Sequence, residues 1–127
     1  MTLFEECLVA LGESAITLSK KDTEKMFENM TTNFPFTSWG KIDWSKVNNV
    51  ISISSTDKIN KHIREKESDV YILWDEASLP SIKAKINTVL SALDDVTAVS
   101  FDTWIYCPSE GYVIEFYHEN KITIGLK

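Results

Sequence analysis

The stretch AVSFDTWIYCPSEGYVIEFYHENKITIGL, residues 98–126, decides the fold class because its apolar residues recur at every second position. Such alternation is typical of β-strands, and it predicts successive antiparallel strands near residues 97–101, 104–107, 112–117 and 122–126. PSEG, residues 108–111, is typical of a four-residue hairpin turn with Gly111 at a positive φ, and Glu119-Asn120 of a tighter turn. The chain therefore ends in a β-meander.

The residues before this meander carry mainly helical spacing. Apolar periodicity and capping residues predict helices at residues 2–11, from 20 to about 33, at 56–67 and from Pro80 to residue 93. Two apolar runs predict strands, VISI at 50–53 and VYILW at 70–74, and we expect the second to be the central strand because it is apolar on both faces. Helices followed by a meander predict one α+β domain spanning residues 1–127, with helices packed on a mixed or antiparallel sheet.

The charge of the chain is negative and unevenly distributed. The net charge is −6. Residues 1–67 hold 10 acids and 9 bases, whereas residues 68–127 hold 9 acids and 4 bases. Such a surface repels phosphate backbones, which argues against direct nucleic-acid binding and favours a basic partner. The alternative is that the acidity only keeps the protein soluble.

The N-terminus and the cysteines indicate a cytoplasmic protein. Glu5 and Glu6 stand where a signal peptide needs basic residues, and the longest apolar run, residues 70–74, is too short to cross a bilayer. We expect no membrane contact. Cys7 and Cys107 are expected to be buried free thiols.

Motifs for catalysis and metal binding are absent. The sequence has no glycine-rich phosphate loop, no G-x-S-x-G and no H-E-x-x-H, and its cysteines and histidines lack the spacing of zinc ligands. We therefore expect no metal, no cofactor and no small-molecule substrate. One enzymatic alternative remains, a small hydrolase in which Asp75 or Glu76 acts with His118, whose side chains would have to lie within about 3 Å of one another.

Acids and aromatic residues provide the candidate binding surface. Asp75 and Glu76 directly follow the predicted central strand, where loops converge. Trp104 and Tyr106 share a strand face with Asp102, an arrangement that suits either sheet packing or an interface with a cationic partner. The acid and aromatic pattern gives this set of candidate partner-binding residues: Asp75, Glu76, Asp94, Asp95, Asp102, Trp104, Glu110 and Tyr112.

Two further tryptophans lie in TSWGKIDW, residues 37–44, inside an irregular connection that Pro35 and Gly40 interrupt. A tryptophan requires a large apolar contact, and its N–H requires a partner. We expect Trp39 and Trp44 to hold this connection against the core.

Three segments resemble the immunity proteins of bacterial contact-dependent growth inhibition systems. They are FPFTSWGKIDW (34–44), VYILWDEASLPSIKAKI (70–86) and the meander at 98–126. The resemblance implies a non-enzymatic protein that binds the C-terminal toxin domain of a large surface-exposed effector one-to-one. Such a toxin is commonly a nuclease, and the immunity protein blocks its active site or substrate path. An acidic surface would then occupy the toxin's phosphate-binding region. A third possibility is a structural subunit that lends a sheet edge to an assembly.

Overall fold

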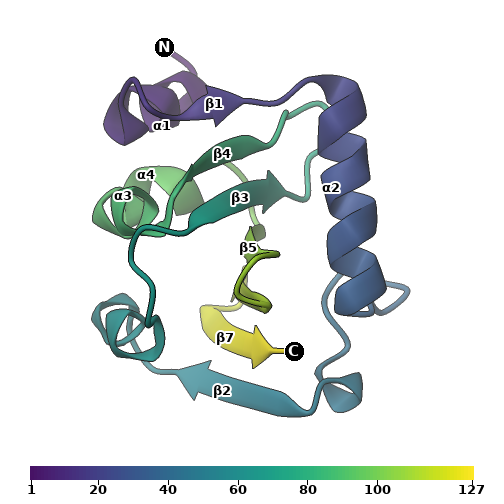
Figure 1. Cartoon of the computed structure of the whole chain (residues 1–127). Helices are drawn as coiled ribbons and strands as arrows, with labels where there is room; N and C mark the ends of the chain where they lie inside the picture. Colours follow the sequence, from purple (N-terminus) through teal and green to yellow (C-terminus); the bar gives the residue numbers. More distant parts are fainter.

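A computed structural model describes all 127 residues and shows a seven-stranded antiparallel sheet with helices on both faces (Figure 1). This confirms the α+β fold class. The helices are α1 (Leu3–Leu11), α2 (Lys20–Asn33), α3 (Ile86–Ser91) and α4 (Leu93–Thr97), with 3₁₀ turns at Trp44–Lys46, Thr56–Lys58 and Asn60–His62. None of the helices has the length and apolar character needed to span a bilayer.

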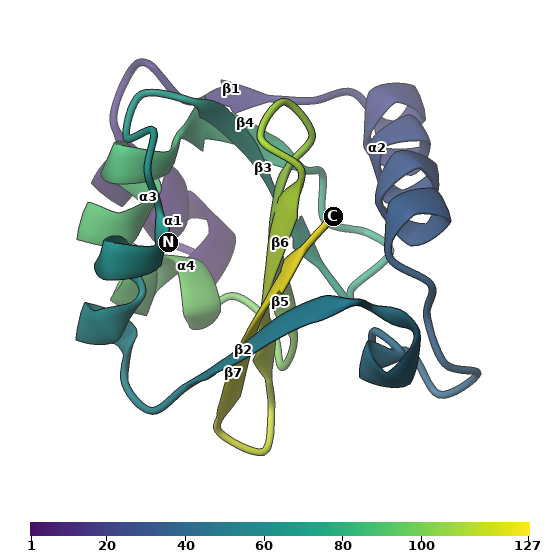
Figure 2. The same ribbon diagram turned by 60° about the horizontal axis from the view of Figure 1, so that its bottom comes forward.

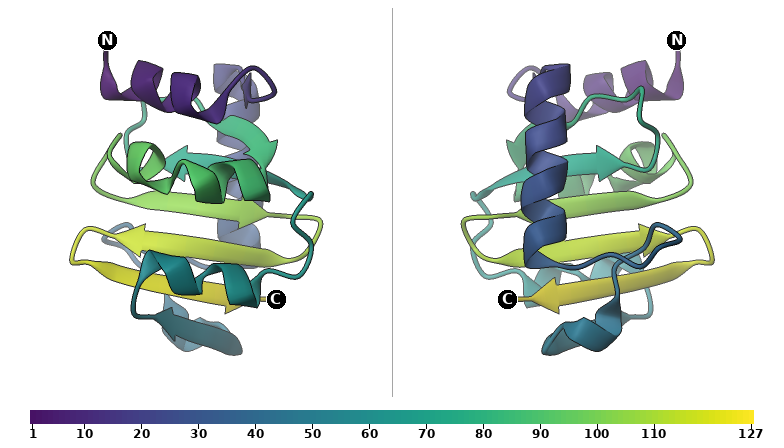
Figure 3. Two further views of the ribbon diagram at one scale, coloured as in Figure 1. Left: turned by 90° about the vertical axis from the view of Figure 1, so that its left-hand side faces the viewer. Right: turned by 90° about the vertical axis from the view of Figure 1, so that its right-hand side faces the viewer.

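The strand order in the sheet is β1-β4-β3-β5-β6-β7-β2. Figure 3 shows the strands one above another in this order. The strands are β1 (Ile16–Thr17), β2 (Asn49–Ile53), β3 (Asp69–Trp74), β4 (Ile82–Lys85), β5 (Thr103–Cys107), β6 (Tyr112–Tyr117) and β7 (Lys121–Leu126). The turns of the meander form as predicted, with Gly111 at φ 72° and Asn120 at φ 61°.

One face of the sheet packs against α1, α3 and α4 (Figure 2). Trp74 is buried between these elements, and its indole N–H donates to the carbonyl of Val96 in α4 over 3.0 Å. Cys7 and Cys107 are free buried thiols in the same core, as predicted.

The opposite face packs against α2 and the irregular segment that follows it (right panel of Figure 3). Met30, Phe34, Trp104 and Tyr106 form this second core. The Tyr106 hydroxyl accepts a hydrogen bond from the Asn33 side chain at 2.9 Å, which ties the end of α2 to β5.

The irregular segment is held by a buried carboxylate. Glu115 in β6 is 1% exposed and accepts three N–H groups, those of the Trp44 indole, the Trp104 indole and the Ile42 backbone, at 2.8–3.0 Å. Trp44 thus holds the connection to the core, as predicted. The same prediction is wrong for Trp39, whose side chain is 71% exposed because it lies at the tip of the loop, outside this network.

Four predicted elements differ from the structure. Residues 82–85, expected to begin a helix, form β4, because Ile82 and Ala84 point into one core while the backbone pairs with β3 and β1. The expected helix over 56–67 is two 3₁₀ turns. Residues 98–102 form a loop after α4 rather than a strand. Finally, β3 is an interior strand, but β5 is the central one.

Candidate partner-binding surface

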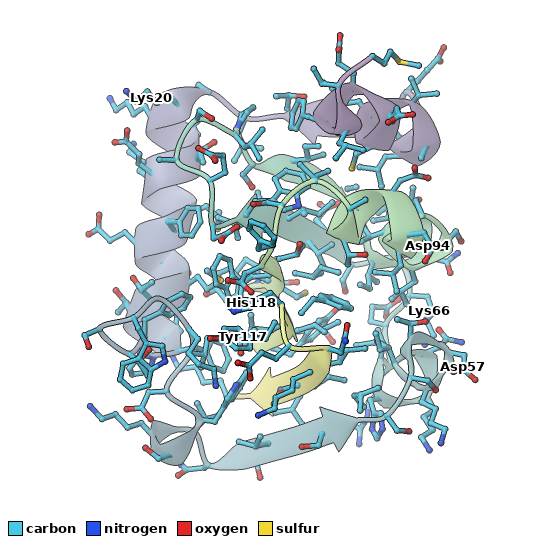
Figure 4. All side chains as sticks on the ribbon, turned by 180° about the vertical axis from the view of Figure 1, so that it is seen from behind. Lys20, Asp57, Lys66, Asp94, Tyr117 and His118 are labelled. Carbon is cyan, nitrogen blue, oxygen red and sulfur yellow. The ribbon has the colours of Figure 1, made fainter.

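One end of the sheet carries a row of polar side chains. Trp74 in β3 pairs with Thr103 in β5, and Thr103 pairs with Phe116 in β6. One position farther toward this end, Asp75 follows β3, Asp102 precedes β5, and Tyr117 is the last residue of β6. The Asp75 N–H donates to the Asp102 carbonyl over 3.3 Å. We call this region the acidic end, because it carries the carboxylates of Asp75, Glu76, Asp102 and Glu119. Tyr117 and His118, labelled in Figure 4, lie within it.

Asp75 fixes the loop that precedes β5. Its Oδ1 accepts the Ser100 hydroxyl at 2.5 Å and the Asp102 backbone N–H at 3.3 Å. Between these two bonded residues, Phe101 is 83% exposed. The loop therefore holds a large apolar ring in solvent on a backbone that is already ordered.

His118 is oriented by Asp102. The Asp102 carboxylate is 6% exposed, and its Oδ1 lies 2.9 Å from the His118 ring Nδ1 while accepting the His118 backbone N–H at 2.8 Å. The imidazole stands between the rings of Tyr117, at 4.2 Å, and Phe101, at 6.5 Å. The three rings form an aromatic row along the acidic end.

The row continues to the segment after α2. The Lys41 ammonium lies 5.2 Å from the centre of the Tyr117 ring. Burial, followed by the nearby carboxylates of Glu119 and Asp102, raises the pKa of Tyr117, so its phenol is neutral at physiological pH. The Tyr117 ring therefore carries no charge, and the carboxylates of Glu119 and Asp102 lie near it.

A pocket of about 380 Å³ opens beside the aromatic row. Its polar lining includes Ser100, Asn120, Lys121 and the Thr103 hydroxyl, which is buried and has no hydrogen-bond partner. Phe101, Phe116 and Ile122 supply apolar walls. The pocket is large enough to receive one side chain of a partner.

The geometry does not assemble the hydrolase that the sequence left open. Asp102 is the carboxylate within 4.0 Å of the His118 ring; neither Asp75 nor Glu76 reaches it. The Ser100 hydroxyl donates to Asp75 rather than to the imidazole, so it is not activated as a nucleophile. No group of three or more His, Cys, Asp or Glu side chains could hold a metal ion.

The other predicted binding residues lie in three different environments. Asp94 and Asp95 are exposed on α4 and line a groove of about 350 Å³ together with Asp57. Figure 4 shows Asp94 and Asp57 apart from His118. Glu110 is exposed at the opposite end of the sheet, in a groove with Lys61 and Arg64. Trp104 and Tyr112 are 2% and 4% exposed and pack in the two cores.

Most of the acidic excess remains free for a partner. Of the nine acids in residues 68–127, Asp102 and Glu115 are buried, and Asp69 lies within 4.0 Å of Lys83 and Lys85. The remaining six are exposed and pair with no cation: Asp75, Glu76, Asp94, Asp95, Glu110 and Glu119. None of these six charges is neutralised by an ion pair within the protein.

Sequence reasoning missed Phe101 and Trp39, the two most exposed aromatic side chains. The alternation of Phe101 with Val99 predicts a strand, and the residue type of Trp39 predicts burial in the core. In the structure both residues lie in loops, with 83% and 71% of their surface exposed.

The comparisons with known proteins identify the family. The chain matches the family described as CdiI immunity protein, EcoliA0-like, over residues 1–125. No curated protein matches the chain. The family match extends over the N-terminal helices, where the sequence resemblance contributed little. Spanning nearly the whole length, it establishes that the chain belongs to the CdiI immunity proteins, which neutralise the toxins of contact-dependent growth inhibition.

Proposed function

We propose that this immunity protein neutralises a nuclease toxin domain by placing its acidic end over the surface where the toxin binds phosphate. The complex is one-to-one and forms in the cytoplasm, and the immunity protein itself catalyses nothing. The observation that carries the proposal is the exposed Phe101 ring beside the unpaired carboxylates of Asp75 and Glu76.

Charge supports this choice of partner. A nuclease that grips RNA or DNA presents lysines and arginines to the phosphates. Carboxylates that have no cation of their own attract such a surface over a distance of about a Debye length, roughly 8 Å at physiological salt, and raise the rate of encounter. Asp75 and Glu76 are exposed and unpaired directly after the end of β3, an interior strand of the sheet.

Preorganisation supports the aromatic part of the surface. Aromatic residues in ordered positions contribute most of the energy in many interfaces, because little side-chain entropy is lost on binding. Phe101 lies between two residues bonded to Asp75, and His118 is held by Asp102. The aromatic row is therefore ready to pack against the toxin without rearrangement.

The test measures association with the small C-terminal toxin domain encoded with this protein, by stopped-flow kinetics over a range of salt concentrations. Reversing Asp75 and Glu76 together to lysine is expected to slow association roughly tenfold at low salt and to flatten the salt dependence. The matched control reverses Asp94 and Asp95, which are also exposed but lie on α4. If reversing Asp75 and Glu76 changes the rate and its salt dependence no more than reversing Asp94 and Asp95 does, the acidic end is not the contact.

Two further measurements separate the parts of the proposal. Phe101→Ala is expected to raise the dissociation rate by at least about tenfold while leaving the free energy of unfolding unchanged, because the ring is 83% exposed. The isolated toxin domain is expected to cleave plasmid DNA or total RNA, and the immunity protein to stop it at equimolar amounts. A toxin without nuclease activity would refute the assigned target.

A further inference from the structure

Trp39 is a tryptophan that the fold leaves in solvent. It is 71% exposed, whereas Trp44, Trp74 and Trp104 all donate their indole N–H groups within the protein. A solvent-exposed tryptophan lacks the apolar contacts through which this residue stabilises a fold. Folding stability therefore does not explain the position of Trp39.

The loop that carries Trp39 is rigid. Phe36 pairs with Ile42 as a β-bridge, and Thr37 and Lys41 are linked by a backbone bond at 2.7 Å and by two bonds to the Thr37 hydroxyl. Gly40, at φ 89°, closes the turn directly after Trp39. The backbone on both sides of the exposed ring is thus fixed.

Glu115 holds the base of this loop. It accepts the backbone N–H of Ile42, three residues after Trp39, at 2.8 Å, and no cation lies within 4.0 Å of its carboxylate. Burying a carboxylate is unfavourable unless hydrogen bonds compensate it. Here three N–H donors compensate it, and two of them belong to the segment that presents Trp39.

The loop reaches the same end of the molecule as the aromatic row. Lys41, two residues after Trp39, lies over the Tyr117 ring, and the right panel of Figure 3 shows the loop beside the β6–β7 turn. A partner domain seated on the acidic end would therefore lie close to the loop that carries Trp39. The charged residues that follow Trp39 in the chain are Lys41, Asp43 and Lys46, and Asp43 pairs with Lys46 at 3.9 Å, so this segment carries no excess of negative charge for a phosphate-binding site.

We propose that Trp39 is an anchor residue that inserts into an apolar pocket of the toxin domain, next to the basic surface covered by the acidic end. The interface then has two parts with different roles. The carboxylates of the acidic end set the association rate and its salt dependence, whereas Trp39 sets the dissociation rate of the complex. Glu115 is the positioning residue for this anchor. The inference rests on the proposed function, because it takes the toxin domain as the partner.

The test compares Trp39→Ala with Val9→Ala, a control at another exposed apolar residue on α1. Using the full chain and the toxin domain, Trp39→Ala is expected to raise the dissociation rate by at least about 30-fold, with unchanged association rate, salt dependence and thermal stability. Val9→Ala is expected to change none of these quantities. A dissociation rate within twofold of wild type for Trp39→Ala would overturn the inference.

Fluorescence gives an independent readout. Binding is expected to shift the tryptophan emission of the wild-type protein to shorter wavelength as Trp39 leaves water, and this shift should be lost in Trp39→Phe. An identical shift in both proteins would also overturn the inference. The two proposals fail separately. If Trp39→Ala changes the dissociation rate but reversing Asp75 and Glu76 has no effect, the anchor stands and the phosphate-mimicking surface is refuted. If reversing Asp75 and Glu76 slows association but Trp39→Ala has no effect, the phosphate-mimicking surface stands and the anchor is refuted.

Discussion

The Trp44 indole donates to the Glu115 carboxylate over 3.0 Å, and this bond joins a segment without regular structure to the middle of the sheet. Trp104, paired directly with Glu115 across β5 and β6, donates to the other carboxylate oxygen. Two indoles and one backbone amide thus enclose a carboxylate that is 1% exposed. This polar network, together with the packing of Phe34 and Ile42 in the second core, holds residues 34–47 against the sheet.

Glu115→Ala is expected to lower the free energy of unfolding by about 2–4 kcal/mol, because three buried donors lose their acceptor. Glu115→Gln is expected to be destabilising as well, since an amide NH₂ would then face an N–H donor. Urea denaturation followed by circular dichroism measures both changes. Glu119→Gln, at an exposed carboxylate in the turn between β6 and β7, serves as the control and should remain within about 0.5 kcal/mol of wild type.

Gly125 in β7 allows the Trp44 ring to lie directly on the strand. A Cβ at this position would be 2.6 Å from Trp44 Cζ3 and 3.3 Å from Phe34 Cε1. Gly125→Ala is therefore expected to displace the indole and to lower the free energy of unfolding by about 1–3 kcal/mol. The displaced ring should also change the near-ultraviolet circular dichroism.

Gly12→Ala is the matched control for Gly125→Ala. Gly12 ends α1 at φ 85° with open space around its Cα, so an alanine there is strained but meets nothing. At φ 85° and ψ −175° the backbone lies in a region that is essentially restricted to glycine, so the substitution should cost about 1–3 kcal/mol, without any change in the near-ultraviolet signal. Equal spectra for the two variants would contradict the close approach of Trp44 to Gly125.

The alkaline stability of the protein depends in part on Cys7. Burial, followed by the charge of Asp95, raises the pKa of this thiol from the ordinary value of 9.0 to about 11. The folded protein therefore retains a proton that the unfolded chain releases, so the stabilisation is complete below pH 9.0 and is lost as the pH rises through about 11. Burial also raises the pKa of Tyr112, which acts in the same direction.

Cys7→Ala is expected to show a smaller loss of unfolding free energy than wild type between pH 9 and about 11. Denaturant titrations at several pH values measure the two slopes. Below pH 9 the slopes should coincide, which controls for the cavity left by the smaller side chain. Parallel curves over the whole alkaline range would show that the thiol remains accessible to solvent.

The sequence predicts the fold class because the meander carries its information locally. Alternating residues from 104 to 126, Gly111 and Asn120 specify three strands and two turns within a short stretch. β1 and β4 were missed for the opposite reason. β1 has two residues and therefore no period, and the spacing of Ile82, Ile86 and Val89 fits a helix until pairing with β3 decides the matter.

The candidate site was less predictable because it depends on register. Asp75 and Asp102 meet only because Trp74 pairs with Thr103, and nothing local in either segment reveals that pairing. Glu110 shares the acidity of these residues but follows the opposite end of β5, so charge alone could not separate the two groups. Exposure of Trp39 likewise follows from the Glu115 network, which joins residues more than seventy positions apart in the chain.

The contact between His118 and Asp102 leads to a prediction about the imidazole tautomer. Because Asp102 Oδ1 lies 2.9 Å from Nδ1, the neutral ring should carry its proton on Nδ1 and leave Nε2 free toward solvent. Most histidines in water favour the other tautomer, so long-range ¹H–¹⁵N correlation spectra at high pH distinguish the two states.

Asp102→Asn retains the size of the side chain but loses the charge, and it should move the ring toward the Nε2 tautomer. His62, half-buried on a 3₁₀ turn with no carboxylate within 4.0 Å of its ring, is the internal reference in the same spectrum. If His118 and His62 give the same pattern, Asp102 does not orient the imidazole, and the aromatic row lacks the preorganisation on which the proposed interface depends.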